Sequence, residues 1–153
     1  MRCIQEYHRD IGQANRDKVI VPDSAHGTNP ASAAFCGFNT EKISENHYGR
    51  IDLFSLKKKL NENVAAVMIT NPNTCGVFEK DILAISKAVH SVGAYLYCDG
   101  ANFNAIVGKI KPADLGIDAM HINLHKTFST PHGGCLLYTS DAADDTPCVD
   151  LGG

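Results

Sequence analysis

The feature that most constrains the fold of this chain is a regular alternation of short apolar runs with amphipathic helical patterns. The run at 64–70 is apolar without alternation, which is typical of a parallel strand covered on both faces. Apolar residues at helical spacing follow at 79–92 and stop at Gly93. A helix of that length returns the chain to the start of a parallel neighbour. The sequence therefore predicts an α/β fold with a mostly parallel sheet and flanking helices.

The same rhythm runs through the chain up to Gly134. Further strands are predicted at 18–22, 38–43, 94–98 and 119–124, further helices at 2–14, 30–37 and 53–60, and a short turn at 113–116. Asp52 is expected to cap the helix at 53–60, and Thr28 or Asn29 the helix at 30–37. Beyond Gly134 the pattern is lost, and no element is predicted there.

Composition narrows the class of protein. Apolar residues make up 44% of the chain and charged residues 20%, the balance of a folded globular protein. A net charge of -3 favours no nucleic-acid partner, and the absence of a long apolar run favours no membrane span. The six cysteines are scattered without a C-x-x-C pair. We therefore expect a reducing cytoplasmic location, or a mitochondrial one if the source is eukaryotic.

Polar side chains with chemical potential follow four of the predicted strands. They are Asp23 and His26, Asn71 and Asn73, Asp99, and the pair His125–Lys126. In parallel sheets, ligands gather at the carboxyl ends of the strands. We therefore expect these side chains to meet along one edge of the sheet.

This set of groups suits pyridoxal phosphate. Lys126 would bind the cofactor carbonyl, and Asp99 would keep the pyridine nitrogen protonated. Asn71 would donate a hydrogen bond to the phenolic oxygen. His26 would stack on one face of the ring, while the small Ala101 packs against the other.

Each residue alone has a simpler interpretation. A lysine after a strand is usually a solvated charge, and the aspartate of Asp99-Gly100 is usually a turn residue. Asn71-Pro72 also marks turns by default, and His26 would serve equally well as a helix cap. Only their joint placement at successive strand ends favours a cofactor site.

A zinc site is the competing constellation. Its candidate ligands are His121, His125, His132 and Asp99. On a strand, however, His121 and His125 would lie about 13 Å apart at roughly 3.3 Å per residue. We therefore predict no metal site. No phosphate-binding glycine motif for nucleotides or dinucleotides is present either.

Four ordered segments, 22–32, 70–74, 97–106 and 121–134, resemble the glycine dehydrogenase (decarboxylating) family, the P-proteins of the glycine cleavage system. The resemblance runs over roughly residues 2 to 134. It implies a fragment of the large domain of a fold type I pyridoxal-phosphate-dependent enzyme. It also implies decarboxylation of glycine, with transfer of the aminomethyl group to the lipoyl arm of the H-protein.

The resemblance also implies roles for individual residues. Lys126 would be the catalytic lysine that holds the cofactor, Asp99 would pair with the pyridine nitrogen, and His26 would be the stacking imidazole. Supporting contacts would come from Asn71, Ala101, His125 and Thr127. The implied partners are glycine and lipoylated H-protein, in a homodimer or a heterotetramer.

The chain departs from the family pattern at both ends. The glycine-rich loop that holds the cofactor phosphate is expected upstream of Met1, and the family continues after Gly134 with further glycines. We therefore predict a partial cofactor-binding large domain at 1–134 and interpret 135–153 as a non-native tail of translated adaptor sequence. The fragment itself is expected to be inactive. The alternatives are another pyridoxal-phosphate decarboxylase or lyase, and a remnant that binds no cofactor.

Overall fold

The computed structural model describes residues 1–128. These residues fall into two units, Met1–Ile122 and a second unit that begins at Asn123. His132 and the segment 135–153, for which the sequence predictions were made, lie outside the described residues.

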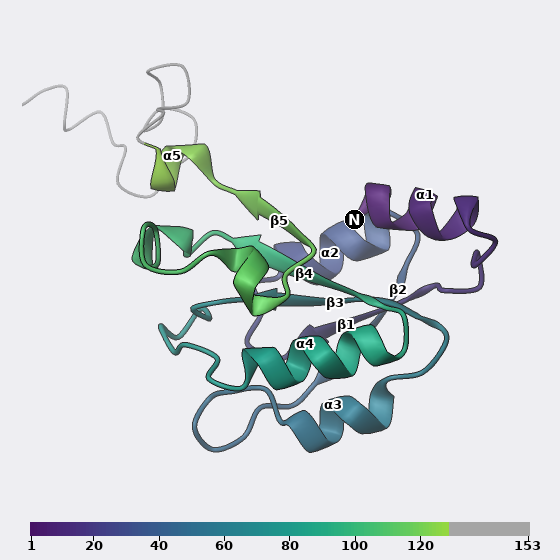
Figure 1. Ribbon diagram of the computed structural model, residues 1–153, viewed down its shortest axis with the longest axis horizontal. Helices are drawn as coiled ribbons and strands as arrows, with labels where there is room; N and C mark the ends of the chain where they lie inside the picture. Colours follow the sequence, from purple (N-terminus) through teal and green to yellow (C-terminus); the bar gives the residue numbers. More distant parts are fainter. Residues whose placement is uncertain (129–153) are drawn as a thin grey trace, which may run out of the picture. The chain divides into compact units, whose positions relative to one another are not determined.

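The first unit is built on a five-stranded sheet in the order β2-β1-β3-β4-β5 (Figure 1). The strands are β1 (Lys18–Pro22), β2 (Asn39–Ile43), β3 (Val64–Thr70), β4 (Tyr95–Gly100) and β5 (Ala119–Ile122). Every neighbouring pair is parallel. The predicted α/β fold with a parallel sheet is therefore confirmed.

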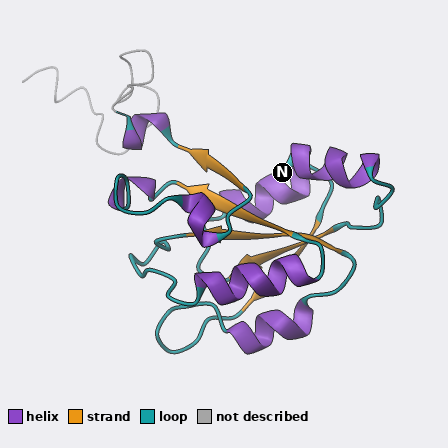
Figure 2. Cartoon of the chain, viewed as in Figure 1, coloured by secondary structure: helices purple, strands orange, loops and turns teal. Residues whose placement is uncertain are grey.

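Helices cover both faces of this sheet (Figure 2). They are α1 (Arg2–Asp10), α2 (Thr28–Phe35), α3 (Leu53–Lys59) and α4 (Ile82–Ser91), with 3-10 turns η1 (Phe103–Ala105) and η2 (Pro112–Leu115). Helices α1 and α2 lie on one face, and α3 and α4 lie on the other. Among the described residues, no helix is long and apolar enough to cross a membrane.

Alternation along the strands divides the core into two layers. Ile20, Val67 and Leu96 belong to the cluster on the α3–α4 side. Val19 and Met68 belong to the cluster on the α1–α2 side. Because successive strand residues point to opposite faces, a continuously apolar run such as β3 supplies both layers.

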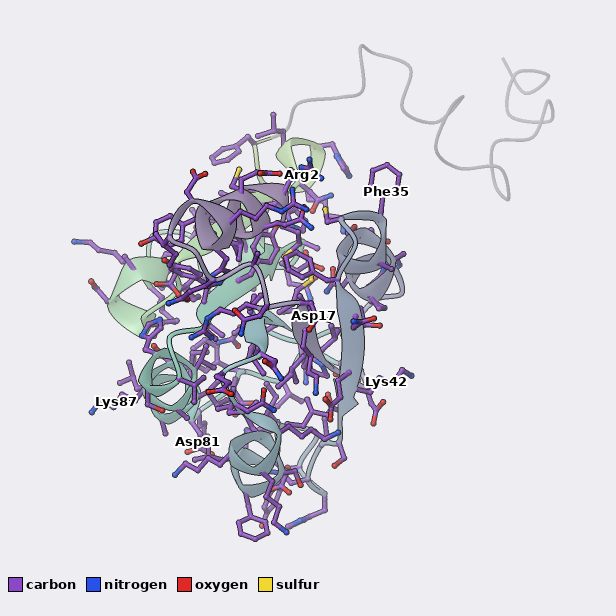
Figure 3. All side chains as sticks on the ribbon, turned by 90° about the vertical axis from the view of Figure 1, so that its right-hand side faces the viewer. Arg2, Asp17, Phe35, Lys42, Asp81 and Lys87 are labelled. Atoms are coloured by element: carbon purple, nitrogen blue, oxygen red, sulfur yellow. The ribbon has the colours of Figure 1, made fainter. Side chains whose placement is uncertain are left out.

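The outer surfaces of the helices carry the charged and exposed side chains (Figure 3). Lys87 of α4 projects from the periphery, and Lys42 does so from the edge strand β2. Phe35, the last residue of α2, is 93% exposed and points away from the unit.

The structure confirms one of the two predicted helix caps and corrects the other. Asp52 caps α3 as predicted, accepting from the backbone N–H groups of Phe54 and Ser55. The predicted cap of α2 is wrong, because Gly27 is the N-cap and makes no side-chain bond. Thr28 instead begins the helix, and the buried Asn29 bonds to another element.

Further elements are shorter than predicted, and the first is α1, which ends at Asp10 and not at residue 14. Helix α4 begins at Ile82 and not at residue 79, because Glu79 accepts the backbone N–H of Ile51 at 2.8 Å and belongs to the preceding loop. The last strand ends at Ile122 and not at Leu124. In the second unit, α5 (Leu124–Thr127) follows Asn123, its N-cap residue.

Candidate functional site

The site in the first unit is organised around Asp99, at the carboxyl end of β4. Its side chain is buried, with 4% of the residue exposed. Carboxylate Oδ1 accepts from the Ala101 backbone N–H at 2.9 Å and lies 3.0 Å from His121 Nε2. The hydroxyl of Thr70 donates to Oδ2 over a longer 3.5 Å. Oδ2 is therefore the carboxylate oxygen with spare acceptor capacity.

The parallel register explains this cluster. Thr70 of β3 lies opposite Asp99, and His121 of β5 lies opposite Asp99 on its other side. Residues directly opposite one another in neighbouring strands point to the same face of a sheet. Three consecutive strands therefore contribute one polar side chain each to a single row.

The row continues in both directions through hydrogen bonds. The amide of Asn29, a buried residue of α2, donates to Thr70 Oγ1 at 3.4 Å. Tyr97 lies two residues before Asp99 on β4, and its hydroxyl is 3.1 Å from His121 Nδ1. The sequence predicted no cofactor-site role for Asn29, Thr70, Tyr97 or His121. Their only signal in the sequence was their position near strand ends, beside residues for which such roles were predicted.

Asn71 presents an unsatisfied group next to this row. The residue is 2% exposed, and its side-chain oxygen accepts from the backbone N–H of Glu79 at 2.9 Å. Its Nδ2 is buried and has no hydrogen-bond partner within residues 1–128. A buried unpaired donor costs about 1–3 kcal/mol. An acceptor on a bound ligand would remove that cost, which fits the donor role predicted for Asn71.

His26 lies apart from the row around Asp99. It is exposed in the loop between β1 and α2, and its Nδ1 accepts from the backbone N–H and the hydroxyl of Thr28 at 3.2 Å and 2.7 Å. Asp23 is also exposed and lies 3.6 Å from the Lys42 ammonium group. The ring of His26 is thus fixed at the start of α2, and no direct contact joins it to Asp99 in the described residues.

The loops after β3 and β4 are tied together beside Ala101. The amide of Asn102 donates to the carbonyl oxygens of Pro72 and Asn73 at 3.0 Å and 3.1 Å. Asn73 in turn accepts two backbone N–H groups of its own loop, so it has a structural role. A cavity of about 430 Å³ lies between the two loops, and Ala101 lines it.

Burial changes the acidity of the groups beside Asp99. Desolvation raises the pKa of the Tyr97 phenol, and the negative charge of Asp99 adds to this effect. Desolvation also raises the pKa of the Cys98 thiol to about 11. Both groups therefore keep their protons at neutral pH.

The second unit carries the predicted lysine. Lys126 lies on α5 and is exposed, and its backbone N–H donates to the Asn123 carbonyl oxygen at 3.0 Å. His125 and Thr127 flank it on the same helix and are partly buried. Because these three residues belong to a different unit from Asp99, their joint placement with it stays a prediction.

No group of three or more His, Cys, Asp or Glu side chains in residues 1–128 is arranged to hold a metal ion. His121, a candidate zinc ligand in the sequence, lies on β5 and is paired with Asp99.

The chain was compared with known families and proteins. The aminotransferase class-V family matches residues 3–153. The probable glycine dehydrogenase (decarboxylating) subunit 2 of Caulobacter vibrioides is 60% identical over 132 residues, which are 86% of this chain and 25% of that protein. Its counterpart from Staphylococcus epidermidis is 59% identical over 134 residues, 88% of this chain and 27% of that protein. The chain therefore spans about a quarter of the length of these relatives.

Solved structures share the fold. A glycine decarboxylase (P-protein) of the glycine cleavage system, in inhibitor-bound form, matches with a TM-score of 0.65 and 24% identity, over 87% of this chain and 29% of that one. A sphingosine-1-phosphate lyase from Burkholderia pseudomallei matches with a TM-score of 0.68 and 18% identity, over 85% of this chain and 32% of that one.

Proposed function

The chain belongs to the aminotransferase class-V family, and from that premise we propose that it is a segment of a pyridoxal-phosphate enzyme that decarboxylates glycine. Relatives at 60% and 59% identity bear the name glycine dehydrogenase (decarboxylating) subunit 2, which supports this substrate and reaction. The structural observation that carries the proposal is the buried Asp99 carboxylate, whose Oδ2 has only one long hydrogen bond within the described residues.

The residues present fit the cofactor. Asp99 Oδ2 would accept from the pyridine nitrogen, and the unpaired Nδ2 of Asn71 would donate to the phenolic oxygen. Lys126 would hold the cofactor through its amine. His26 would cover the ring and Ala101 would border it, with supporting contacts from His125 and Thr127.

Pyridoxal phosphate supplies an electron sink for the pair left at the glycine Cα when carbon dioxide departs. The protein's share of this chemistry is electrostatic. A buried carboxylate at Asp99 stabilises a proton on a neighbouring ring nitrogen, because the attraction between opposite charges is stronger in a low-dielectric site. The Asn71 amide would stabilise negative charge on the phenolic oxygen of the bound cofactor.

The partner proposed for the intact enzyme is lipoylated H-protein, which would accept the aminomethyl group on its lipoyl arm. A homodimer or a heterotetramer is the proposed assembly. The scattered cysteines support the proposed cytoplasmic location, or a mitochondrial one in a eukaryote.

Borohydride trapping tests the cofactor assignment. The chain is mixed with pyridoxal phosphate, reduced and digested, and the labelled peptide is identified by mass spectrometry. We expect Lys126 to carry most of the label and a Lys126→Met variant to lose it. The exposed cluster Lys57, Lys58 and Lys59 on α3 is the internal control. Equal labelling of that cluster and of Lys126 would contradict the assignment and favour a remnant that binds no cofactor.

The substrate is tested in the full-length parent enzyme that contains this segment. We expect exchange of labelled bicarbonate into glycine to depend on lipoylated H-protein. Exchange with another amino acid, or without H-protein, would favour a different pyridoxal-phosphate decarboxylase or lyase.

A further inference from the structure

His121 is paired with Asp99 at the carboxyl ends of β5 and β4. His121 Nε2 lies 3.0 Å from Asp99 Oδ1, and its side chain is 42% exposed while that of Asp99 is 6% exposed. One end of the imidazole therefore faces a buried carboxylate. Its other nitrogen, Nδ1, lies 3.1 Å from the hydroxyl of Tyr97.

The chemistry of the three groups fixes where the proton lies in each of the two contacts. An ionised carboxylate can only accept, so Nε2 of His121 must carry a proton. In the neutral imidazole Nδ1 is then the acceptor, and Tyr97 must donate its hydroxyl proton. The phenol can do this at neutral pH, because desolvation and the charge of Asp99 raise the pKa of Tyr97.

The two oxygens of the Asp99 carboxylate therefore differ in their contacts. The Ala101 backbone N–H donates to Oδ1, and His121 Nε2 lies 3.0 Å from the same oxygen. Oδ2 receives only the long bond from Thr70 among the described residues. Donors on Oδ1 fix the rotation of the carboxylate and stabilise its charge, and they leave Oδ2 free to accept a further donor.

We propose that His121 and Tyr97 are positioning residues that orient Asp99, so that Oδ2 faces the ring nitrogen of the cofactor. This role rests on the proposed pyridoxal-phosphate function. His121 and Tyr97 act through Asp99 and need no contact with the cofactor themselves. In this arrangement the Tyr97 hydroxyl determines which ring nitrogen of His121 carries the proton. His121 in turn fixes the orientation of the Asp99 carboxylate.

The first test needs no cofactor. Nitrogen-15 NMR of the selectively labelled chain, at a pH where the imidazole is neutral, distinguishes the two tautomers of His121. We expect the Nε2–H tautomer in the unmodified chain and a mixture of tautomers in Tyr97→Phe. A predominant Nδ1–H tautomer in the unmodified chain would overturn the proposal, and so would an unchanged spectrum in the variant.

The second test measures retention of pyridoxal phosphate by the full-length parent enzyme that contains this segment, using equilibrium dialysis together with the absorbance spectrum of the bound cofactor. We expect His121→Leu to weaken retention roughly tenfold, as for loss of a hydrogen bond to a charged group. His121→Gln keeps an N–H donor of similar reach, so we expect it to restore retention to within about threefold of the unmodified enzyme.

The chain offers a control at the amino-terminal end of β5, the strand that carries His121. His90 Nε2 lies 2.8 Å from Asp118 Oδ2, and the His90 side chain is 41% exposed. His90→Leu therefore removes a comparable pair without touching Asp99, and it should leave retention unchanged. Equal losses in His90→Leu and His121→Leu would overturn the positioning role. So would equal retention in His121→Leu and the unmodified enzyme.

The two tests separate failure of the inference from failure of the proposed function. If the full-length parent enzyme retains no pyridoxal phosphate, the proposed cofactor function fails, and the role of His121 toward the cofactor fails with it. The tautomer measurement would still decide whether the contacts among Tyr97, His121 and Asp99 exist. If retention of pyridoxal phosphate is normal but His121 carries its proton on Nδ1, only the positioning role of His121 and Tyr97 is contradicted.

Discussion

At the scale of single residues, β4 ends with two buried neighbours of opposite character. The carboxylate of Asp99 accepts from the Ala101 backbone N–H and the Thr70 hydroxyl and lies 3.0 Å from His121 Nε2. Cys98 points to the other face, where its thiol is 1% exposed in the apolar core beneath α4. Asp99 faces the candidate cofactor site and Cys98 faces the core, because successive side chains along a strand point to opposite faces of the sheet.

The thiol of Cys98 is predicted to resist alkylation in the folded protein. Burial raises its pKa to about 11, so almost no thiolate forms near neutral pH. Cys3 and Cys75 are exposed and serve as internal controls. Reaction with iodoacetamide at pH 8, followed by peptide mass spectrometry, should label both controls well before Cys98. Labelling of all three at one rate would contradict the prediction.

The same raised pKa predicts how stability depends on alkaline pH. The unfolded thiol titrates near about 8.5, whereas the folded thiol titrates at about 11. The native state therefore holds the proton more tightly, and stability is lost as the pH rises through this window. Urea denaturation of a Cys98→Ala variant should show a smaller decline between those two pH values than the unmodified chain.

At the scale of elements, the contact between β4 and β5 depends on Gly100. A Cβ atom at this position would overlap the backbone carbonyl oxygen of His121. Backbone in a paired strand cannot move aside as a flexible side chain can. Close approach of the two strands is also what brings His121 to Asp99.

Gly100→Ala is therefore predicted to separate β5 from β4. We expect a loss of roughly 2 kcal/mol or more in the free energy of unfolding, as for an overpacked core position. Gly27→Ala is the control, because a Cβ there meets nothing within 4 Å and its backbone is helical. Urea denaturation of both variants measures the difference. Similar stability in the two variants would show that the strands tolerate the added methyl group.

At the scale of the whole first unit, Arg16 connects segments that are distant in sequence. Its guanidinium donates to the carbonyl oxygens of Val64 and Val92 at 2.7 Å and 2.8 Å. Its Nε donates to Gln13 at 2.7 Å. The loop after α1 is thus fastened to the start of β3 and to the end of α4.

Arg16→Met is predicted to destabilise the unit by about 1–3 kcal/mol, because it removes the donors from two carbonyl groups. Arg9→Met is the control, since Arg9 forms an exposed ion pair with Glu6 that is worth about 0–1 kcal/mol. Urea unfolding followed by circular dichroism and by tyrosine fluorescence measures both losses. We expect the two signals to change together, and separate transitions in the unmodified chain would contradict a single cooperative unit.

Much of this fold was predictable because its signals are local. Apolar runs and helical spacing identified every strand and α-helix of the first unit but not the 3-10 turn η1, and the Asp52 cap was confirmed. The errors lie at element ends. There Asn29 and Glu79 bond to distant groups that no local pattern reveals.

The sequence by itself determined the parallel sheet, the polar residues at its carboxyl edge and the resemblance that singles out Lys126 and Asp99. Only the tertiary structure decided which carboxylate oxygen has the closer contacts, that His121 lies within 3.1 Å of both Asp99 and Tyr97, and that Asn71 keeps an unpaired donor. The reason is physical. Periodicity acts over a few residues, whereas strand register follows from packing across the whole sheet and pairs side chains far apart in the chain.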